Sequence, residues 1–282
     1  MKQLSKGLQK KVDFAISLIQ KAVRNEVVEV AYSGGKDSDV ILELTKMAGV
    51  KYRAIYKSTT IDPPGTIKHC KEKGVEIIRP EHDYFTLVSL HGLSNRINRM
   101  CCHYLKEYKI LDYCIQGIRR CESTARKKRY SESDPIVCRN FPKTGHVNII
   151  LPILSWTNRD EKEFIEKLNL KCHPLYYDDE GKFHVERRLG CFGCPLVSDQ
   201  GIGDYMKNPR WLRPLTRAVK IFWKTHPHAK CTKKYINPYG HIARNLFFHS
   251  DLDFNTASSI DFNGETIDWK IELEKFFNIE LP

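Results

Sequence analysis

The sequence predicts an α/β protein, with a doubly wound, mostly parallel sheet that carries helices on both faces and a small C-terminal appendage. Short β-rich runs alternate with helical segments along most of the 282-residue chain. A glycine turn separates the first β-rich run from the helix after it, and prolines and aromatic residues become frequent from Asp199 onward. In sheets of this kind, ligands bind at the carboxyl ends of the strands.

The elements are expected in the following order. Residues 4–24 carry apolar side chains at helical spacing and should form an amphipathic helix. A strand over 27–32 follows, and after the glycine turn a helix over 37–48 should end at Gly49. Further strands are expected over 52–56, 75–78, 115–118 and 148–151, and further helices over 66–73, 85–90, 104–111, 160–168 and 269–277.

These elements divide the chain into three parts. Residues 1–26 form an N-terminal helix, residues 27–198 form the sheet domain with the candidate sites, and residues 199–282 form a helical appendage. Hydrophobic residues make up 41% and charged residues 28% of the chain, so the composition excludes disorder and a fibrous repeat. A chain of this length can bury an ordinary core.

Charge and cysteine content narrow the function classes. Lysine and arginine exceed aspartate and glutamate by 46 − 34 = 12, and a basic surface attracts nucleic acid or phosphorylated small molecules. No apolar run approaches the ~20 residues of a membrane span, and the N-terminus lacks a signal-peptide core. We therefore expect a cytoplasmic protein without a membrane partner, whose ten cysteines are metal ligands, redox groups or buried thiols.

The strongest motif lies between the first expected strand and the helix after it. It consists of Ser33, Gly34, Gly35, Lys36, Asp37 and Ser38. The glycines let the backbone turn closely around an anion, and the helix N-terminus offers N–H groups to it. Lys36 can neutralise phosphate oxygens, whereas Asp37 can cap the helix or hold Mg²⁺. A lone glycine pair would indicate only a turn, and the spacing is not that of a Walker A loop.

Two pairs of cysteines form the second motif. Cys101 and Cys102 are adjacent, and Cys191 and Cys194 form a Cys-x-x-Cys pair followed by Pro195. Two such pairs can converge on one zinc ion or on an iron–sulfur cluster. Adjacent cysteines point in different directions on regular backbone, which suits a cubane cluster better than one small ion. The alternative is a set of buried, unreactive thiols.

The string SGGKDS resembles the pyrophosphate loop of the adenine-nucleotide α-hydrolase-like enzymes, which cleave ATP between its α and β phosphates. Over about residues 27–196, the chain resembles the phosphoadenosine phosphosulfate (PAPS) reductase family. Besides the loop, this resemblance rests on Cys101-Cys102-His103-Tyr104-Leu105-Lys106, on the Gly-x-Arg-x-x-x-Ser-x-x-Arg block from Gly117 to Arg126, on Pro152-Ile153-Leu154-Ser155-Trp156, on Pro174-Leu175-Tyr176 and on Arg188-Leu189-Gly190-Cys191.

The resemblance implies roles for these residues. Cys101, Cys102, Cys191 and Cys194 would hold a 4Fe–4S cluster, as the paired cysteines of adenylyl-sulfate reductases do. In the block that opens at Gly117, Arg119 and Arg126 would bind nucleotide phosphates, each with a bidentate fork. Thr59 and Asp62 follow the second expected strand, where such folds place ribose and phosphate contacts, although a plain turn explains this segment equally well.

Two departures from the family pattern point away from sulfate reduction. Sulfonucleotide reductases of the family attack sulfate with a cysteine near the C-terminus, whereas the last cysteine here is Cys231. Those reductases also carry an altered loop, because they expel no pyrophosphate. An intact loop together with cluster cysteines is expected of sulfur-inserting relatives, such as the DNA phosphorothioation ATPase and the cluster-dependent tRNA thiolation enzymes.

The function expected from these observations is ATP-dependent adenylylation in sulfur transfer onto a nucleic acid, with ATP, Mg²⁺ and a 4Fe–4S cluster as cofactors. Lys36 and Asp37 are the expected catalytic residues, and the sulfur would come from a donor such as a cysteine desulfurase. One alternative is a sulfonucleotide reductase that forms sulfite with a thiol reductant, in which Cys231 or a partner thiol replaces the missing cysteine. Another is a non-catalytic accessory protein that binds nucleotides and nucleic acid.

Overall fold

The computed structural model describes residues 3–23, 25–131, 134–197, 199, 201–235, 237–247 and 267–282. The chain divides into two compact units. The first consists of Met1–Ser58, Asp62–Arg79 and Leu105–Gly190, and the second of Thr59–Ile61, Pro80–Tyr104 and Cys191–Pro282. The three-part division drawn from the sequence stays a prediction.

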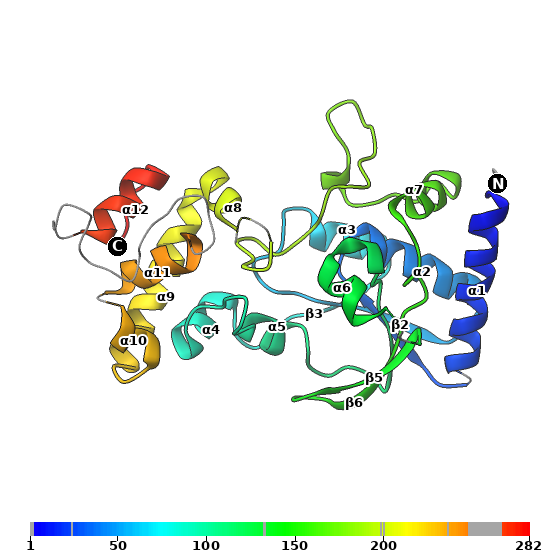
Figure 1. The fold of residues 1–282 in the computed structure, drawn as a ribbon, viewed down its shortest axis with the longest axis horizontal. Coiled ribbons are helices and arrows are strands. Elements are labelled where there is room, and N and C mark those ends of the chain that lie inside the picture. The colour runs from blue at the N-terminus through cyan, green and yellow to red at the C-terminus, as the bar shows by residue number, and fades with distance from the viewer. Residues whose placement is uncertain are drawn as a thin grey trace. The chain divides into compact units, whose positions relative to one another are not determined.

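The first unit is built on one sheet (Figure 1). Its strands in the described chain are β1 (Val28–Tyr32), β2 (Tyr52–Lys57), β3 (Glu76–Ile78), β4 (Tyr113–Ile115), β5 (Ile136–Phe141) and β6 (Gly145–Ile150). They are arranged in the order β3-β2-β1-β4-β6-β5, and all neighbours are parallel except β5 and β6. The predicted α/β fold with a mostly parallel sheet is therefore confirmed.

The helices of the first unit are α1 (Lys6–Val23), α2 (Lys36–Ala48), α3 (Thr66–Glu72), α6 (Thr124–Arg129) and α7 (Asn158–Lys167), with short 3₁₀ turns at Arg120–Glu122 and Pro174–Tyr176. Each connects or flanks strands of the sheet. The expected helices over 4–24, 37–48, 66–73 and 160–168 correspond to α1, α2, α3 and α7.

The central strand β1 is covered on both faces. Successive residues of a strand point to opposite faces, and Val30 and Tyr32 join one buried cluster with apolar side chains of α1 and α2. Ala31 packs against a second cluster, which includes Cys114 of β4 and Ile149 of β6. Because both faces are buried, four of the five residues of β1 are apolar, which is typical of a central parallel strand. The exception is Glu29, which is buried and forms an ion pair with Lys57.

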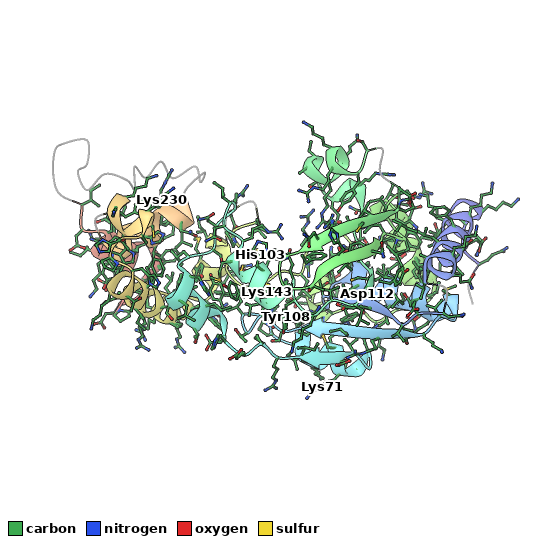
Figure 2. The ribbon with its side chains drawn as sticks, turned by 90° about the horizontal axis from the view of Figure 1, so that it is seen from below. Lys71, His103, Tyr108, Asp112, Lys143 and Lys230 are labelled. Atoms are coloured by element: carbon green, nitrogen blue, oxygen red, sulfur yellow. The ribbon has the colours of Figure 1, made fainter. Side chains whose placement is uncertain are left out.

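Three local expectations differ from the structure. The strand expected over 115–118 is β4, Tyr113–Ile115, because the chain then packs with Gly117 against the start of α2. A helix is expected over 104–111, but α5 (Met100–Leu105) ends at Leu105 and residues 106–111 form no helix. Tyr108 instead forms a β-bridge with Lys143 (Figure 2), and the Leu111 N–H donates to Glu29 Oε2 at 3.0 Å. These tertiary contacts outweigh the local helical pattern.

The hairpin of β5 and β6 is the third difference, because no strand was expected between residues 118 and 148. Its turn depends on Gly145, whose φ of 94° lies in the left-handed region that favours glycine. As an antiparallel edge strand, β5 has a half-exposed, mixed sequence that gives only a weak strand signal.

The second unit is helical. Its helices in the described chain are α4 (Tyr84–His91), α5 (Met100–Leu105, whose last residue belongs to the first unit), α8 (Ile202–Lys207), α9 (Leu212–Thr225), α10 (Lys230–Lys234), α11 (Pro238–Phe247) and α12 (Trp269–Phe277), with a 3₁₀ turn at Pro209–Trp211. The longest of these, α9, packs against α4 and α11 (Figure 1). None of the helices in the described ranges is both long and apolar enough to cross a bilayer.

Candidate functional site

Residues 33–35, which we call the glycine loop, connect the end of β1 directly to the start of α2. Gly34 has a φ of 78°, and Gly35 is the N-cap residue of α2. Gly35 itself offers no side-chain cap, and the Lys36 backbone hydrogen-bonds with the Tyr176 hydroxyl. Helix N-termini of this kind are places where anions bind. The Ser38 hydroxyl donates to the Gly35 carbonyl at 2.6 Å and lies 3.3 Å from Ser33 Oγ, which closes the loop on itself.

Two glycines at the loop are required by close packing. A Cβ on Gly34 would lie 2.9 Å from Thr66 Cγ2 of α3. A Cβ on Gly117 would lie 2.9 Å from the carbonyl oxygen of Asp37, which is backbone and cannot swing away. The segment after β4 therefore lies directly against the first turn of α2, and Gly117 makes that approach possible.

Replacement of Gly117 by alanine is expected to displace the start of α2 and to destabilise the protein by about 1–3 kcal/mol, as overpacking of an interior does. Gly7, near the start of α1, is the matched control, because a Cβ there meets no atom within 4 Å. Gly7→Ala is expected to leave stability unchanged or to raise it by roughly 0.4–1 kcal/mol. Urea unfolding of both variants checks this, and equal stability of the two would contradict the assigned packing.

Four charged side chains meet at the first turn of α2. Lys36 Nζ lies 2.9 Å from Asp37 Oδ2 and 3.3 Å from Glu161 Oε2. Arg119 Nε lies 2.5 Å from Asp37 Oδ1, and another guanidinium nitrogen, Nη2, lies 3.0 Å from Glu161 Oε2. We call these four residues the ionic cluster. Two cations and two carboxylates balance one another there, and three of the four side chains are almost fully buried.

Arg119 is the most completely engaged member of the ionic cluster. It is 2% exposed, and besides the two carboxylates its Nη1 donates to Asn158 Oδ1 at 2.8 Å and to Cys121 Sγ at 3.3 Å. The sequence analysis expected Arg119 and Arg126 to play the same part. Arg126 differs, because its side chain is 41% exposed and pairs with Glu122 within its own segment.

The two carboxylates of the ionic cluster titrate differently. Burial opposes ionisation of Asp37, but the adjacent Lys36 and Arg119 outweigh it and hold the pKa of Asp37 below its ordinary value. Burial, followed by the negative charge of Asp37, raises the pKa of Glu161 to about 8. The oxygens of Glu161 lie within ion-pair distance of both cations but accept no hydrogen bond from the described residues. Near neutral pH, Glu161 can therefore hold a proton.

This raised pKa makes stability depend on pH. The folded protein keeps the Glu161 proton up to about pH 8, whereas the unfolded chain loses it near pH 4.5. Between these values the folded state binds more protons, so stability falls as pH rises, by at most ~1.4 kcal/mol per pH unit. Glu161→Gln is expected to remove this part of the pH dependence in urea unfolding between pH 5.5 and 8. Parallel curves for wild type and variant would contradict the assignment.

Glu161 was not among the residues predicted from the sequence, although its position on α7 indicates that it is buried. Glu161 lies on the same side of α7 as Phe164 and Ile165, at spacings of three and four residues, and all three are buried. A carboxylate on the apolar face of an amphipathic helix needs a cationic partner. Its partners could not be identified from the sequence, because Lys36 and Arg119 come from distant segments.

A second network of polar side chains connects β1, α2 and α3 next to the glycine loop. The carboxylate of Asp39, in the first turn of α2, accepts a hydrogen bond from the Tyr32 hydroxyl at 2.5 Å and lies 3.1 Å from His69 Nε2 of α3. Lys73 Nζ lies 3.5 Å from the same carboxylate. Burial, followed by the charge of Asp39, raises the pKa of Tyr32 far above its ordinary value. These contacts fix α3 against α2, and thereby hold Thr66 against the glycine loop.

The two remaining candidates for nucleotide contacts lie after β2. Asp62 belongs to the first unit and accepts a hydrogen bond from Ser58 Oγ at 2.9 Å. Thr59 is buried and belongs to the second unit. The structure thus gathers the loop, Gly117 and Arg119 around the first turn of α2. The nucleotide-binding roles of these residues, and those of Thr59, Asp62 and Arg126, stay predictions.

The four candidate cysteines all belong to the second unit. Cys101 and Cys102 lie on α5, whereas Cys191 and Cys194 lie in the segment before α8, and all four are half-buried. Gly193 completes this Cys-x-x-Cys turn with a φ of 62°, and a Cβ there would lie 2.6 Å from the hydroxyl oxygen of Tyr205. Close packing therefore requires glycine between the two cysteines.

The thiols influence one another and a buried tyrosine. Hydrogen bonding with Cys102, burial and the charges of Cys102 and Cys191 raise the pKa of Cys101 far above its ordinary value. Burial, followed by Tyr205 and then by Cys101, Cys194 and Cys191, raises the pKa of Tyr84. Among the residues that the structure describes, no group of three histidine, cysteine or acidic side chains is gathered closely enough for a single metal ion.

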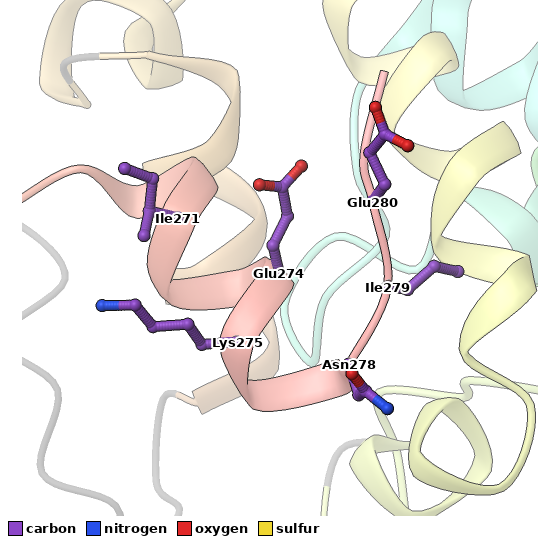
Figure 3. Close-up of a pocket in the computed structure, with 6 residues that line it drawn as sticks. All are labelled: Ile271, Glu274, Lys275, Asn278, Ile279 and Glu280. Atoms are coloured by element: carbon purple, nitrogen blue, oxygen red, sulfur yellow. The ribbon is translucent and has the colours of Figure 1, made fainter.

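A pocket in the second unit lies beside the C-terminal helix (Figure 3). Its lining consists of Ile271, Glu274, Lys275, Asn278, Ile279 and Glu280. None of the candidate residues named above is among them, so this pocket does not belong to the site.

Solved structures of three enzymes are similar to the chain. FMN adenylyltransferase from Candida glabrata, solved with FMN and the ATP analogue AMPCPP, has a TM-score of 0.43 and 13% identity, and the match covers 60% of this chain and 59% of that enzyme. NH₃-dependent NAD synthetase from Campylobacter jejuni has a TM-score of 0.41 and 14% identity, with 79% and 96% covered. NMN synthetase from Francisella tularensis has a TM-score of 0.40 and 13% identity, with 82% and 95% covered.

No curated protein matches the chain. One family model does, that of the phosphoadenosine phosphosulfate reductase domain, over residues 27–197. This range is more than half of the chain, and it includes the glycine loop, the ionic cluster and all four candidate cysteines. The resemblance noted in the sequence is confirmed, and the chain belongs to the phosphoadenosine phosphosulfate reductase domain family.

Proposed function

We propose that this protein is an ATP-dependent adenylylating enzyme that acts in sulfur transfer onto a nucleic acid and carries a 4Fe–4S cluster. The observation that carries the proposal is the intact Ser-Gly-Gly-Lys-Asp-Ser loop, which leads into the N-terminus of α2 beside a buried ionic cluster. A site built in this way suits a polyphosphate with a leaving pyrophosphate, because positive groups lie where negative charge develops.

Each group at the loop then has a role in the proposed reaction. The N–H groups of the first turn of α2 bind phosphate oxygens, and the Lys36 ammonium neutralises charge on the leaving pyrophosphate. Asp37 fits magnesium, because its carboxylate is ionised, partly exposed and located at the mouth of the loop. Arg119 is a positioning residue, since its hydrogen-bonding groups are directed to Asp37, Glu161 and Asn158.

The reaction has two displacements. An oxygen of the nucleic acid attacks the α-phosphorus of ATP, the bond to the bridging oxygen breaks, and pyrophosphate leaves. A sulfur nucleophile from the donor then attacks the activated carbon, the carbon–oxygen bond breaks, and AMP leaves with that oxygen. Because a cysteine desulfurase delivers persulfide sulfur, this attack joins donor and acceptor through a disulfide. Two electrons from thiols, such as the free cysteine supplied with the donor, then cleave that disulfide and leave the sulfur on the acceptor.

The four cysteines fit an iron–sulfur cluster in kind and number. They come from two segments of one unit, and Tyr84 lies within the electrostatic range of three of them. A single small ion suits them less well, because adjacent cysteines such as Cys101 and Cys102 point in different directions on regular backbone. When bound, a cluster supplies a site that holds sulfur or passes electrons.

Iron and sulfide analysis after anaerobic purification tests the cluster. We expect about four irons and four sulfides per chain, with both lost in Cys191→Ser. Cys138→Ser is the matched control, because Cys138 is an exposed cysteine of the first unit and should leave the iron content unchanged. Zinc in place of iron, or equal iron in the two variants, would contradict this part of the proposal.

Sulfur incorporation tests the function as a whole. The protein is incubated with ATP, magnesium, a cysteine desulfurase with cysteine, and total transfer RNA or plasmid DNA, and the digested nucleosides are examined for added sulfur by mass spectrometry. Sulfite formed from a sulfonucleotide with thioredoxin would establish a reductase instead. That alternative needs Cys231 or a partner thiol as the nucleophile, and burial raises the pKa of the Cys231 thiol, which makes its reactive thiolate scarce. ATP binding without any product would indicate an accessory protein.

A further inference from the structure

The second unit contains a long segment with positive charge only. Residues 205–247 include no aspartate or glutamate. Their ten basic residues are Lys207, Arg210, Arg213, Arg217, Lys220, Lys224, Lys230, Lys233, Lys234 and Arg244. Solvated protein surfaces ordinarily carry charges of both signs. A segment of this length with basic residues and no carboxylate is therefore typical of a surface that binds an anionic partner.

Four of these residues form one stripe along α9. Arg213, Arg217, Lys220 and Lys224 recur at intervals of four, three and four residues, which places them on one face of the helix, and all four are exposed. The opposite face of α9 is buried and apolar. We call this stripe the basic face of α9. Its residues span about 16 Å along the helix axis, at 1.5 Å per residue.

The positive charge continues into the next helix. After a short turn, α10 begins at Lys230 (Figure 2) and also carries Lys233 and Lys234, all of them exposed. The Lys234 ammonium lies over the ring of Tyr235, 5.6 Å from its centroid. The same ring stacks on His241 of α11, with 5.1 Å between the ring centroids, so the contribution of α10 to binding comes from its lysines.

The basic face of α9 lacks acidic partners in the part of the chain that the structure describes. Elsewhere, exposed basic residues pair with carboxylates, as Arg53 does with Glu76 and Lys275 with Glu272. On α9, by contrast, Arg213 donates to the carbonyl oxygen of Glu280, and Lys220 lies over the ring of Tyr239. Neither contact neutralises a charge, so among the residues that the structure describes the stripe keeps its full positive charge.

We propose that the basic face of α9, together with the lysines of α10, binds the phosphate backbone of a nucleic acid. Four cations spread over about 16 Å face roughly five phosphates of one strand, at ~3.4 Å per phosphate along a duplex. A membrane fits this helix less well, because an interfacial helix inserts its apolar face, and that face of α9 is buried in the second unit. On the proposed function, the bound nucleic acid is the acceptor itself.

The salt dependence of binding tests this inference with the full-length protein. A fluorescent 20-base-pair DNA duplex and a total transfer RNA fraction serve as probes, titrated between 50 and 200 mM salt. The test variant is Arg217→Gln/Lys220→Gln/Lys224→Gln, which keeps Arg213 and its contact with Glu280. The control is Lys6→Gln/Lys10→Gln/Lys21→Gln, which removes three exposed charges from α1 in the first unit.

The test variant should lose three phosphate contacts, so the slope of log affinity against log salt concentration should become shallower by about 2.7 for the duplex. Over that fourfold salt range, the affinity of the wild type should therefore fall roughly 40-fold more than that of the test variant. The α1 control should retain the wild-type slope, and thermal unfolding should show that both variants are folded. Arg217→Lys, which keeps the charge, should bind as wild type does.

Three results would overturn the inference: equal losses in the two triple variants, which would indicate a general effect of net charge; an unchanged slope in the α9 variant; or binding to phosphatidylserine vesicles without binding to either nucleic acid. The measurement needs neither ATP nor a cluster. It can therefore succeed where sulfur transfer fails, and the two failures are distinguishable.

Discussion

Replacement of Arg119 by glutamine is expected to lower the free energy of unfolding by about 3–5 kcal/mol, which is the usual cost of breaking a buried ion pair from one side. The guanidinium is 2% exposed and contacts both carboxylates of the ionic cluster. Without it, the ionised Asp37 keeps one cation, Lys36, in a site with little water, and the protonated Glu161 loses the contact with the guanidinium. Urea unfolding at pH 7 measures the loss.

Arg126→Gln is the control for this prediction. Arg126 lies in the same sequence block, but its side chain is 41% exposed, and its ion pair with Glu122 lies within one short segment. Exposed pairs of this kind contribute about 0.2–1 kcal/mol. Similar losses for the two variants would show that the ionic cluster is not the buried, mutually dependent group described above.

The second large effect is expected at Lys36. On the proposed function, Lys36→Gln should lower the rate of pyrophosphate release from ATP by about 10²–10³-fold, as the loss of one preorganised group that stabilises developing charge does. The ammonium stands at the first position of α2, between Asp37 and Glu161, where the leaving pyrophosphate would take over its charge. Steady-state pyrophosphate detection measures the rate.

Lys46→Gln is the control on the same helix. Lys46 lies in the last turn of α2, is largely exposed and pairs with Glu43. Its loss should leave the rate within a factor of two or so, since exposed pairs of this type have little influence on their surroundings. A Lys36→Gln variant with an undiminished rate and an intact fold would remove Lys36 from the chemistry.

The loop was predictable from the sequence because its determinants are local. A β-rich run, a glycine pair and a helix with Gly49 after its end follow one another within about twenty residues, and local pattern suffices for each. The parallel sheet followed from the alternation of such units. The helix expected over 104–111 failed for the opposite reason, because Tyr108 and Leu111 are held by contacts with Lys143 and Glu29, which no local pattern contains.

The site was only partly predictable, because it too depends on contacts between segments that are distant in the sequence. Lys36, Asp37 and Arg119 could be named from motifs, but the sequence gives no sign that Arg119 is buried against Glu161 rather than open to a ligand. The placement of all four candidate cysteines in the second unit, apart from the glycine loop in the first, was also not visible in the sequence. Both depend on how distant segments come together in the fold.

The most direct test of the account is the identity of the products formed from ATP. The anaerobically purified protein is incubated with magnesium, ATP labelled at the α-phosphorus and a nucleic-acid acceptor, and the products are separated by chromatography. Before a sulfur donor is added, we expect pyrophosphate together with an equal amount of label on the nucleic acid, and after it is added, release of that label as AMP. ADP with inorganic phosphate, or consumption of a sulfonucleotide without any cleavage of ATP, would contradict it.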